Sequence, residues 1–284
     1  MKVTNNEITY GKDTTHILKT ISRDSIKGVE AHAHSDAPKD YKEFGFKIIT
    51  EKRALKVAVL TKKEQDIFVH HVSPKRVFGT DLEFLMTLDS HMHAKVPVVI
   101  EQCIYELTKN GKLFTEGLFR VSGGETDMKN MVNEYDTSDM TCNVHGEWSG
   151  NPLKNMSVHV VAGILKKYLR DLPDSVIPIS EYDGFMQIFK QDSSNEEKIC
   201  RIQEVISRLS QNRYNILNMV SFVLYQTHLN NRLMKASNLG LVMGPNLLKQ
   251  ETVNMTEIMI LAKISEFLIT NYEQLFDSNA EYLN

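Results

Sequence analysis

The chain has 284 residues, of which 42% are hydrophobic and 24% charged, proportions that are typical of a soluble globular protein. Its formal net charge of −3 at pH 7 provides no overall attraction to nucleic acid or to an anionic membrane, so we expect neither as a direct partner. No apolar run reaches the roughly 18 residues that span a bilayer, and the first residues are too polar for a signal peptide. We therefore expect a cytoplasmic protein, for which any membrane association is indirect.

The N-terminal quarter of the chain is predicted to be a small appendage that contains strands. Residues 1–40 are polar and show no sustained period, so weak order is expected there. Three runs rich in Ile, Val and Phe follow at Phe44–Thr50, Ala54–Leu60 and Asp66–Val72, separated by charged turns, and they are typical of strands. Three strands form a marginal sheet. We therefore expect residues 1–74 to pack on the remainder of the chain or on a partner, and not to form a complete lipid-binding domain.

After a boundary at Ser73–Lys75 the period of apolar residues becomes helical, with repeats at i, i+3, i+4 and i+7. This spacing predicts helices around residues 100–107, 128–135, 158–169, 182–189, 199–209, 216–224 and 255–268. A further helix is expected from Asn238 and is predicted to break at Gly244–Pro245, because proline removes a helical hydrogen bond. Residues 75–284 are thus predicted to form an all-α domain.

One segment between the first two predicted helices concentrates unusual residues. Residues 115–125 read TEGLFRVSGGE, which places Arg120 between apolar neighbours and shortly before a glycine pair. The spacing of Ser122 and Glu125 matches a capping box, so the segment is predicted to close onto the start of a helix. A loop braced in this way presents a guanidinium to a partner with little conformational entropy left to lose. Arg120 is therefore the principal candidate for a functional residue.

The helix predicted at residues 158–169 carries a second candidate surface. Residues at i, i+4, i+7 and i+11 lie on one stripe of a helix, and here they are His159, Gly163, Lys166 and Arg170. Lys167 points in another direction and is expected to pair with Asp171. The stripe thus presents two cations on one face, apart from the face that enters the core.

Other reactive residue types do not form a recognisable site. The three cysteines lack the spacing of metal ligands and are expected to be free thiols that serve in packing: Cys103, Cys142 and Cys200. Pairs of histidines occur, but no cysteine or carboxylate cluster completes a coordination set, so no metal site is expected. Trp148 lies in a long loop without a period and is interpreted as an anchor of that loop.

Three sequence blocks together resemble the signature of a known family. They are EGLFRVSG at Glu116–Gly123, LKKYLRDLP at Leu165–Pro173 and NLGLVMGPNLL at Asn238–Leu248. Their order and spacing are similar to those of the Rho GTPase-activating (RhoGAP) domain, over about residue 75 to the end of the chain. The resemblance implies a RhoGAP-like bundle of about eight or nine helices at residues 75–284, preceded by the small β-containing segment.

The resemblance also implies a function for the four candidate residues. Domains of this family bind the GTP-bound form of Rho-family small GTPases and insert an arginine finger, here Arg120, beside the transferred phosphate. Lys166 and Arg170 resemble the cations that face the partner, and Asn238 resembles the polar residue that closes the site. GTP and Mg²⁺ would belong to the GTPase, so the chain would be an activator without a cofactor of its own rather than a hydrolase. Its role would lie in small-GTPase signalling and regulation of the cytoskeleton.

Structural interpretations of the same residues remain open. Arg120 could pair with a carboxylate, Lys166 and Arg170 could form a solvated helix face, and Asn238 could be a buried amide that packs between helices. The chain as a whole could be a catalytically silent RhoGAP-like binding module. Two local departures from the family pattern, a shortened turn before Asn212 and a glycine at position 240 where alanine is usual, concern packing away from Arg120.

Overall fold

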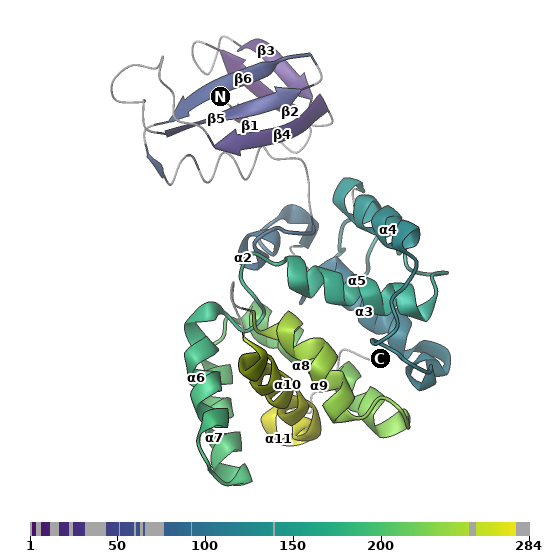
Figure 1. Cartoon of the computed structure of the whole chain (residues 1–284). Coiled ribbons are helices and arrows are strands. Elements are labelled where there is room, and N and C mark those ends of the chain that lie inside the picture. Colours follow the sequence, from purple (N-terminus) through teal and green to yellow (C-terminus); the bar gives the residue numbers. More distant parts are fainter. Residues whose placement is uncertain are drawn as a thin grey trace. The chain divides into compact units, whose positions relative to one another are not determined.

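The computed structural model describes residues 2–3, 7–11, 17–22, 25–31, 44–50, 52–59, 61–62, 65, 77–91, 93–138, 140–249 and 254–276. The chain divides into two compact units, Met1–Arg76 and Val77–Asn284, and each is described by itself (Figure 1). The third predicted strand, Asp66–Val72, and the predicted boundary at Ser73–Lys75 lie outside the described residues.

The described residues of the first unit form two antiparallel sheets of three strands each. One has the order β1-β2-β3 and the other β4-β5-β6, with the bounds β1 (Lys2–Val3), β2 (Glu7–Gly11), β3 (Ile17–Ser22), β4 (Ile26–Ala31), β5 (Phe44–Thr50) and β6 (Ala54–Val59). Alternate residues of β5 enter the core, as expected for a strand with one buried face. Residues from both sheets share one hydrophobic cluster: Ile8, Ile21, Ile26, Phe46, Ile48 and Val59.

The prediction of weak order for residues 1–40 is wrong, because β1 to β4 lie there. The runs predicted at Phe44–Thr50 and Ala54–Leu60 do form β5 and β6. Strand propensity depends strongly on cross-strand neighbours and on burial, and Ile8 of β2 and Ile21 of β3 are buried only because the sheets meet. Short strands with many polar residues therefore left no clear period in the sequence.

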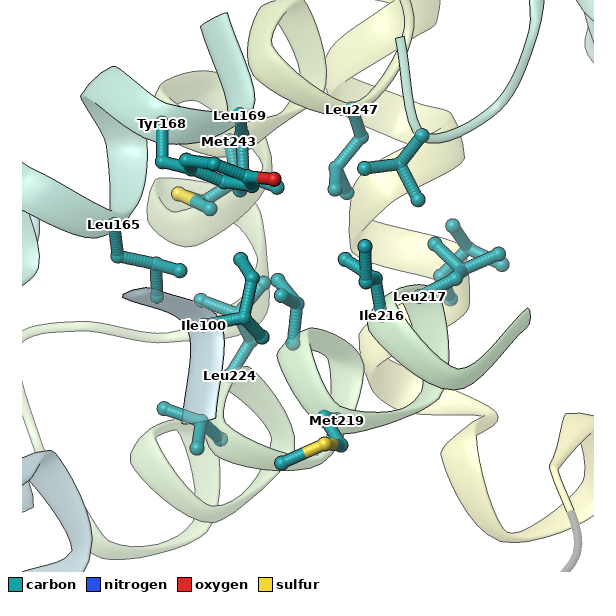
Figure 2. Close-up of a cluster of buried hydrophobic side chains, with 14 of the residues drawn as sticks. Ile100, Leu165, Tyr168, Leu169, Ile216, Leu217, Met219, Leu224, Met243 and Leu247 are labelled. Atoms are coloured by element: carbon teal, nitrogen blue, oxygen red, sulfur yellow. The ribbon is translucent and has the colours of Figure 1, made fainter. Parts of the chain in front are cut away.

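The regular secondary structure in the described part of the second unit is helical, as predicted, apart from one isolated bridge between Cys142 and Trp148. Its elements are α2 (Leu82–Leu85), η3 (Asp89–His91), α3 (Val98–Thr108), η4 (Lys109–Phe114), α4 (Glu125–Thr137), α5 (Val158–Asp171), α6 (Ile179–Lys190), α7 (Asn195–Ser207), α8 (Gln211–Asn230), α9 (Ala236–Leu247), α10 (Met255–Thr270) and α11 (Tyr272–Leu275). Figure 2 shows how Ile100 of α3, Leu165 and Leu169 of α5, Leu224 of α8 and Met243 of α9 meet in one buried cluster. This core fixes α3, α5, α8 and α9 relative to one another.

The helices α5 and α10 begin with side-chain caps. The hydroxyl of Ser157 accepts a hydrogen bond from the Val160 amide at the start of α5 (3.3 Å). At α10, Asn254 and Glu257 form a reciprocal capping box. Each cap satisfies amide donors that the first helical turn leaves unpaired. No helix in the described ranges combines the length and the apolar character that crossing a bilayer requires.

The capping box predicted at Ser122 and Glu125 is not formed. Gly124 is the residue before α4, and no side-chain cap bonds there. The reason is a tertiary contact one residue earlier: a Cβ at Gly123 would lie 2.6 Å from the Cα of Val160 in α5. The backbone path into α4 is therefore set by its close approach to α5.

The predicted break at Gly244–Pro245 is also wrong, since α9 continues through Pro245 to Leu247. Pro245 lacks an amide hydrogen and cannot donate to the carbonyl one turn earlier, but only two helical residues follow it in α9. The contact between α9 and α10 also holds this segment, because Cβ atoms at Gly240 and Gly244 would lie 2.4 and 2.5 Å from backbone oxygens of α10. Gly240 thus replaces the usual alanine at a point where the two backbones leave no room for a methyl group.

Candidate functional site

The segment that carries Arg120 folds as a tight turn between η4 and α4. The amides of Arg120 and Val121 both donate to the carbonyl of Gly117, at 2.9 and 2.8 Å. Gly117 and Phe119 both have φ of +67°, a left-handed conformation that is unstrained for glycine but costs a bulky residue about 1 kcal/mol or more. Phe119 is fully buried, and this burial offsets the strain.

The Arg120 side chain points away from this buried anchor. Leu118 and Phe119, directly before it, are fully buried, whereas Arg120 is exposed. Among the residues that the structure describes, its guanidinium makes no hydrogen bond or ion pair. The sequence-based alternative, an arginine paired with a carboxylate, is not found in this part of the chain. An exposed guanidinium on a turn with an anchored backbone is available to bind phosphate or carboxylate oxygens.

Helix α5 contacts the turn through Lys166. The Lys166 ammonium donates a hydrogen bond to the carbonyl of Phe119. Burial lowers the pKa of this half-buried lysine, and the neighbouring charge of Arg170 lowers it further. The role of Lys166 as a partner-facing cation stays a prediction, and the contact that its ammonium makes in the structure is with the residue directly before Arg120.

The remaining residues of the α5 stripe differ in their surroundings. Arg170 is exposed, one turn beyond Lys166, and its side chain has no bonded partner within the described ranges. Lys167 pairs with Asp171 at 2.7 Å, as predicted. The ring of His159 is half-buried, and its Nδ1 atom has no hydrogen-bond partner among the described residues.

Asn238 lies in the first turn of α9 and is exposed. Its side-chain amide donates to the carbonyl of Leu233 at 2.8 Å, so the sequence-based alternative of a buried amide that packs between helices is wrong. A residue that the sequence analysis missed, Asn231, contacts both the segment before Arg120 and the segment before Asn238. Asparagine directly after a helix is a signal of local side-chain to backbone bonding, but not of which distant segment it reaches.

The candidate site is therefore a group of polar and cationic residues in two connected regions, which are the Arg120 turn with α5 and the start of α9. Arg120 and Lys166 are brought together through the carbonyl of Phe119, Arg170 follows on α5, and Asn238 is joined to the Arg120 segment through Asn231. Within the described part of the chain, no group of three or more His, Cys, Asp or Glu residues is placed to hold a metal ion. The chemistry that the site offers is binding of negative charge by an exposed guanidinium.

Comparisons with known proteins place this geometry in a family. Residues 97–252 match the family model described as the RhoGAP domain. Mouse Rho GTPase-activating protein 15 is 28% identical over 214 residues, which are 72% of this chain and 41% of that protein. Human Rho GTPase-activating protein 24 is 29% identical over 213 residues, or 72% of this chain and 27% of that protein. The chain thus spans less than half the length of these relatives.

Solved structures show the same fold. The crystal structure of human Rho GTPase activating protein 15 covers 77% of this chain and 100% of its own, with a TM-score of 0.61 and 22% identity. The BH domain from Graf, the GTPase regulator associated with focal adhesion kinase, covers 63% of this chain and 93% of its own, with a TM-score of 0.54 and 22% identity. The helical unit is the part of the chain that carries the family match.

Proposed function

The chain belongs to the RhoGAP family, and from this premise we propose that it is a GTPase-activating protein for Rho-family small GTPases, with Arg120 as the arginine finger. The observation that carries the proposal is the exposed Arg120 guanidinium, which has no partner among the described residues and stands on a turn held by buried neighbours. The protein is then an activator that supplies a catalytic residue to its partner, and GTP and Mg²⁺ are held by the GTPase.

The chemistry of GTP hydrolysis explains why an arginine is required. Charge on the phosphoryl oxygens must be stabilised as the γ-phosphoryl group is transferred to water, and a finger supplied by a second protein is worth about 10³ to 10⁵ in rate in the related Ras system. A guanidinium is always charged and offers several donors in one plane, so it can contact more than one oxygen. A finger that is already positioned loses little entropy when it enters the nucleotide site.

The other site residues have supporting roles in this proposal. Lys166 holds the carbonyl of Phe119 and so sets the direction of Arg120, while Arg170 faces the GTPase and attracts its acidic surface. Asn238 closes the site from α9. These roles place the protein in small-GTPase signalling, with regulation of the cytoskeleton as the expected outcome and the cytoplasm as the place of action.

A catalytically silent binding module is the second candidate, and retention of Arg120 as an exposed residue argues against it. A hydrolysis assay separates the two. Purified Rho-family GTPases are loaded with GTP, and phosphate release in a single turnover is measured with and without the full chain. Acceleration of at least one GTPase by about 10³-fold or more is expected. Absence of acceleration for every GTPase that binds the chain would leave the silent module.

Binding affinities provide a second test of the same proposal. Contacts made only in the transition state strengthen as its charge develops, and the switch segments of a GTPase are ordered by the γ-phosphate. Affinity is therefore expected to rise from the GDP form to the GTP-analogue form, and again to GDP with aluminium fluoride. Equal affinity for the three forms would contradict a role for Arg120 in catalysis.

A further inference from the structure

We propose that Asn231 is a positioning residue, which holds the Arg120 turn and the start of α9, where Asn238 lies, in fixed positions relative to each other. The inference rests on the proposed function, since it assigns to Asn231 the task of keeping two elements of one partner-binding site in register. The backbone amide of Asn231 donates to the Thr227 carbonyl at 2.8 Å, so its own position is set by the end of α8.

The side chain of Asn231 is buried and makes four hydrogen bonds, all to backbone. Its Nδ2 atom donates to the carbonyls of Leu113 (3.1 Å) and Thr115 (2.9 Å). Its Oδ1 atom accepts from the amides of Leu233 and Met234, both at 3.1 Å. One planar amide thus uses its donor half for the segment before Arg120 and its acceptor half for the segment before α9.

The backbone groups that each half of the amide bonds are connected to the site by further hydrogen bonds. On the donor side, the Thr115 carbonyl also accepts from the amide of Leu118, at 3.2 Å, and Leu118 is the first of the two buried residues that anchor the Arg120 turn. On the acceptor side, the Leu233 carbonyl accepts the side-chain amide of Asn238. Two loops that are more than 100 positions apart are therefore joined through a single side chain.

The segment before Arg120 has little regular structure that could replace this link. Asn110 and Gly111 both have positive φ inside η4, so the chain reverses there and leaves the helical hydrogen-bonding pattern. Buried carbonyls without a donor are costly, and Asn231 supplies the donor to Leu113 and a second donor, beside the Leu118 amide, to Thr115. Loss of that donor is expected to loosen the turn while the buried core of the helical unit stays in place.

Substitutions can separate the contribution of the amide's donor half from that of its acceptor half. Asn231→Asp has nearly the same shape and keeps an acceptor for Leu233 and Met234, but it cannot donate to Leu113 and Thr115. Asn231→Ala removes the donors together with the acceptor and introduces no charge, and it serves if the aspartate variant does not fold. The matched control is Asn215→Asp, at a buried asparagine within α8, which donates to the Lys95 carbonyl at 3.0 Å and accepts from Gln211.

Amide hydrogen exchange in the full chain tests the structural step without any GTPase. In the Asn231 variants, the amides of Leu118, Arg120 and Val121 are expected to exchange about tenfold faster or more, because each donates within the turn. The Asn215→Asp control is expected to leave these three amides unchanged. Unchanged exchange at all three amides in both Asn231 variants would overturn the proposal.

Single-turnover hydrolysis tests the functional step. At saturating concentration of the full chain, the maximal rate is expected to fall about tenfold in the Asn231 variants, with less than about a threefold change in the concentration for half-saturation. A fall of the same size in Asn215→Asp would reduce Asn231 to a general stability residue and overturn its positioning role. If the wild-type chain accelerates no GTPase, the proposed function fails, whereas the exchange experiment still decides the link made by Asn231.

Discussion

Two irregular segments flank α4, and they use their side chains in opposite ways. The segment before α4 anchors its backbone and buries Phe119, while Arg120 stays exposed without a bonded partner among the described residues. The segment after α4 turns its tryptophan inward: Trp148 donates to the carboxylate of Glu101 at 2.9 Å and meets the ring of His91 edge-on, with centroids 5.1 Å apart. The first segment therefore presents an exposed side chain, whereas the second is attached to α3 and η3 by its tryptophan.

The attachment of the second segment extends to its backbone. Cys142 pairs with Trp148 in an isolated antiparallel bridge, and its amide donates to the carbonyl of Ser90 at 2.9 Å. Burial raises the pKa of Glu101, against the lowering effect of its bond with Trp148. The interpretation of Trp148 as a loop anchor agrees with these contacts. Mutations in the two segments are thus expected to affect different measurements.

The largest effect is expected for Arg120→Ala. The maximal rate of hydrolysis at saturating chain should fall by about 10³-fold or more, because the variant loses charge stabilisation in the transition state. The free energy of unfolding should change by less than about 0.5 kcal/mol, since the side chain is exposed. Stopped-flow hydrolysis and urea unfolding measure the two quantities. A variant that keeps the wild-type rate would remove Arg120 from the catalytic role.

Trp148→Ala should show the reverse pattern. Removal of a large aromatic side chain with a satisfied N–H is expected to lower the free energy of unfolding by about 3 kcal/mol. The maximal rate of hydrolysis should stay within about twofold of wild type, because the segment contacts α3 and η3 rather than the Arg120 turn. Val144→Ala is the control in the same segment, where the side chain is 71% exposed. A stable Trp148→Ala protein would contradict the attachment role.

The stability of the protein should depend on pH through His91, the residue of η3 that Trp148 of the second segment contacts. Burial lowers the pKa of His91 to about 4 from an ordinary value of 6.5, so the folded state resists protonation. The corresponding stability is fully present above pH 6.5 and is lost as the pH falls towards 4, up to about 3 kcal/mol in total. The difference between wild-type and His91→Gln unfolding curves from pH 7.5 to 4.5 isolates this contribution. A constant difference across that range would show that His91 does not titrate as inferred.

A smaller effect is expected at the support of the first segment. Lys166→Met keeps an apolar stem of similar length but removes the donor to the Phe119 carbonyl, which should cost about 1 to 2 kcal/mol in the activation free energy. The maximal rate should therefore fall by about tenfold, with a smaller change in the concentration for half-saturation. If only the half-saturation changes, Lys166 contacts the GTPase directly and does not act through the turn.

The smallest effect is expected for Arg170→Ala. This exposed cation should weaken binding of the GTP form by about 1 kcal/mol, more at low salt than at high salt, and leave the maximal rate unchanged. Lys167→Ala is the control on the same helix, because Lys167 pairs with Asp171 and a partly exposed pair of this kind contributes little. Titration of binding at two ionic strengths measures both. Equal effects of the two substitutions would contradict a specific role for Arg170.

Much of the helical unit was predictable from the sequence because its information is local. Apolar periodicity located each long helix from α3 to α10, and the residue directly before α5 is Ser157, a residue type that favours the cap position it occupies. Arg120 was identified as the principal candidate from its neighbours, although the capping box expected to brace its loop is not formed. These features depend on residues within one or two turns of the chain, so a single sequence contains the signal.

Features that depend on distant segments could not be predicted in this way. The strands β1 to β4 exist because two sheets bury a shared cluster, and the missing cap at Ser122 reflects the close approach of Gly123 to Val160. The continuation of α9 through Pro245 accompanies its tight contact with α10. In each case a favourable contact between remote residues outweighs a local preference of about 1 to 3 kcal/mol.

The sequence by itself thus determined the all-α class predicted for residues 75–284, the order of the helices and the identity of Arg120 as the principal candidate. Only the tertiary structure decided that Lys166 donates to the carbonyl of Phe119 and that Asn238 is exposed. It also decided that Asn231 joins the segment before Arg120 to the segment before Asn238. The physical reason is that periodicity records which face of a helix is buried, whereas the direction of a hydrogen bond depends on which backbone groups the fold leaves unpaired nearby.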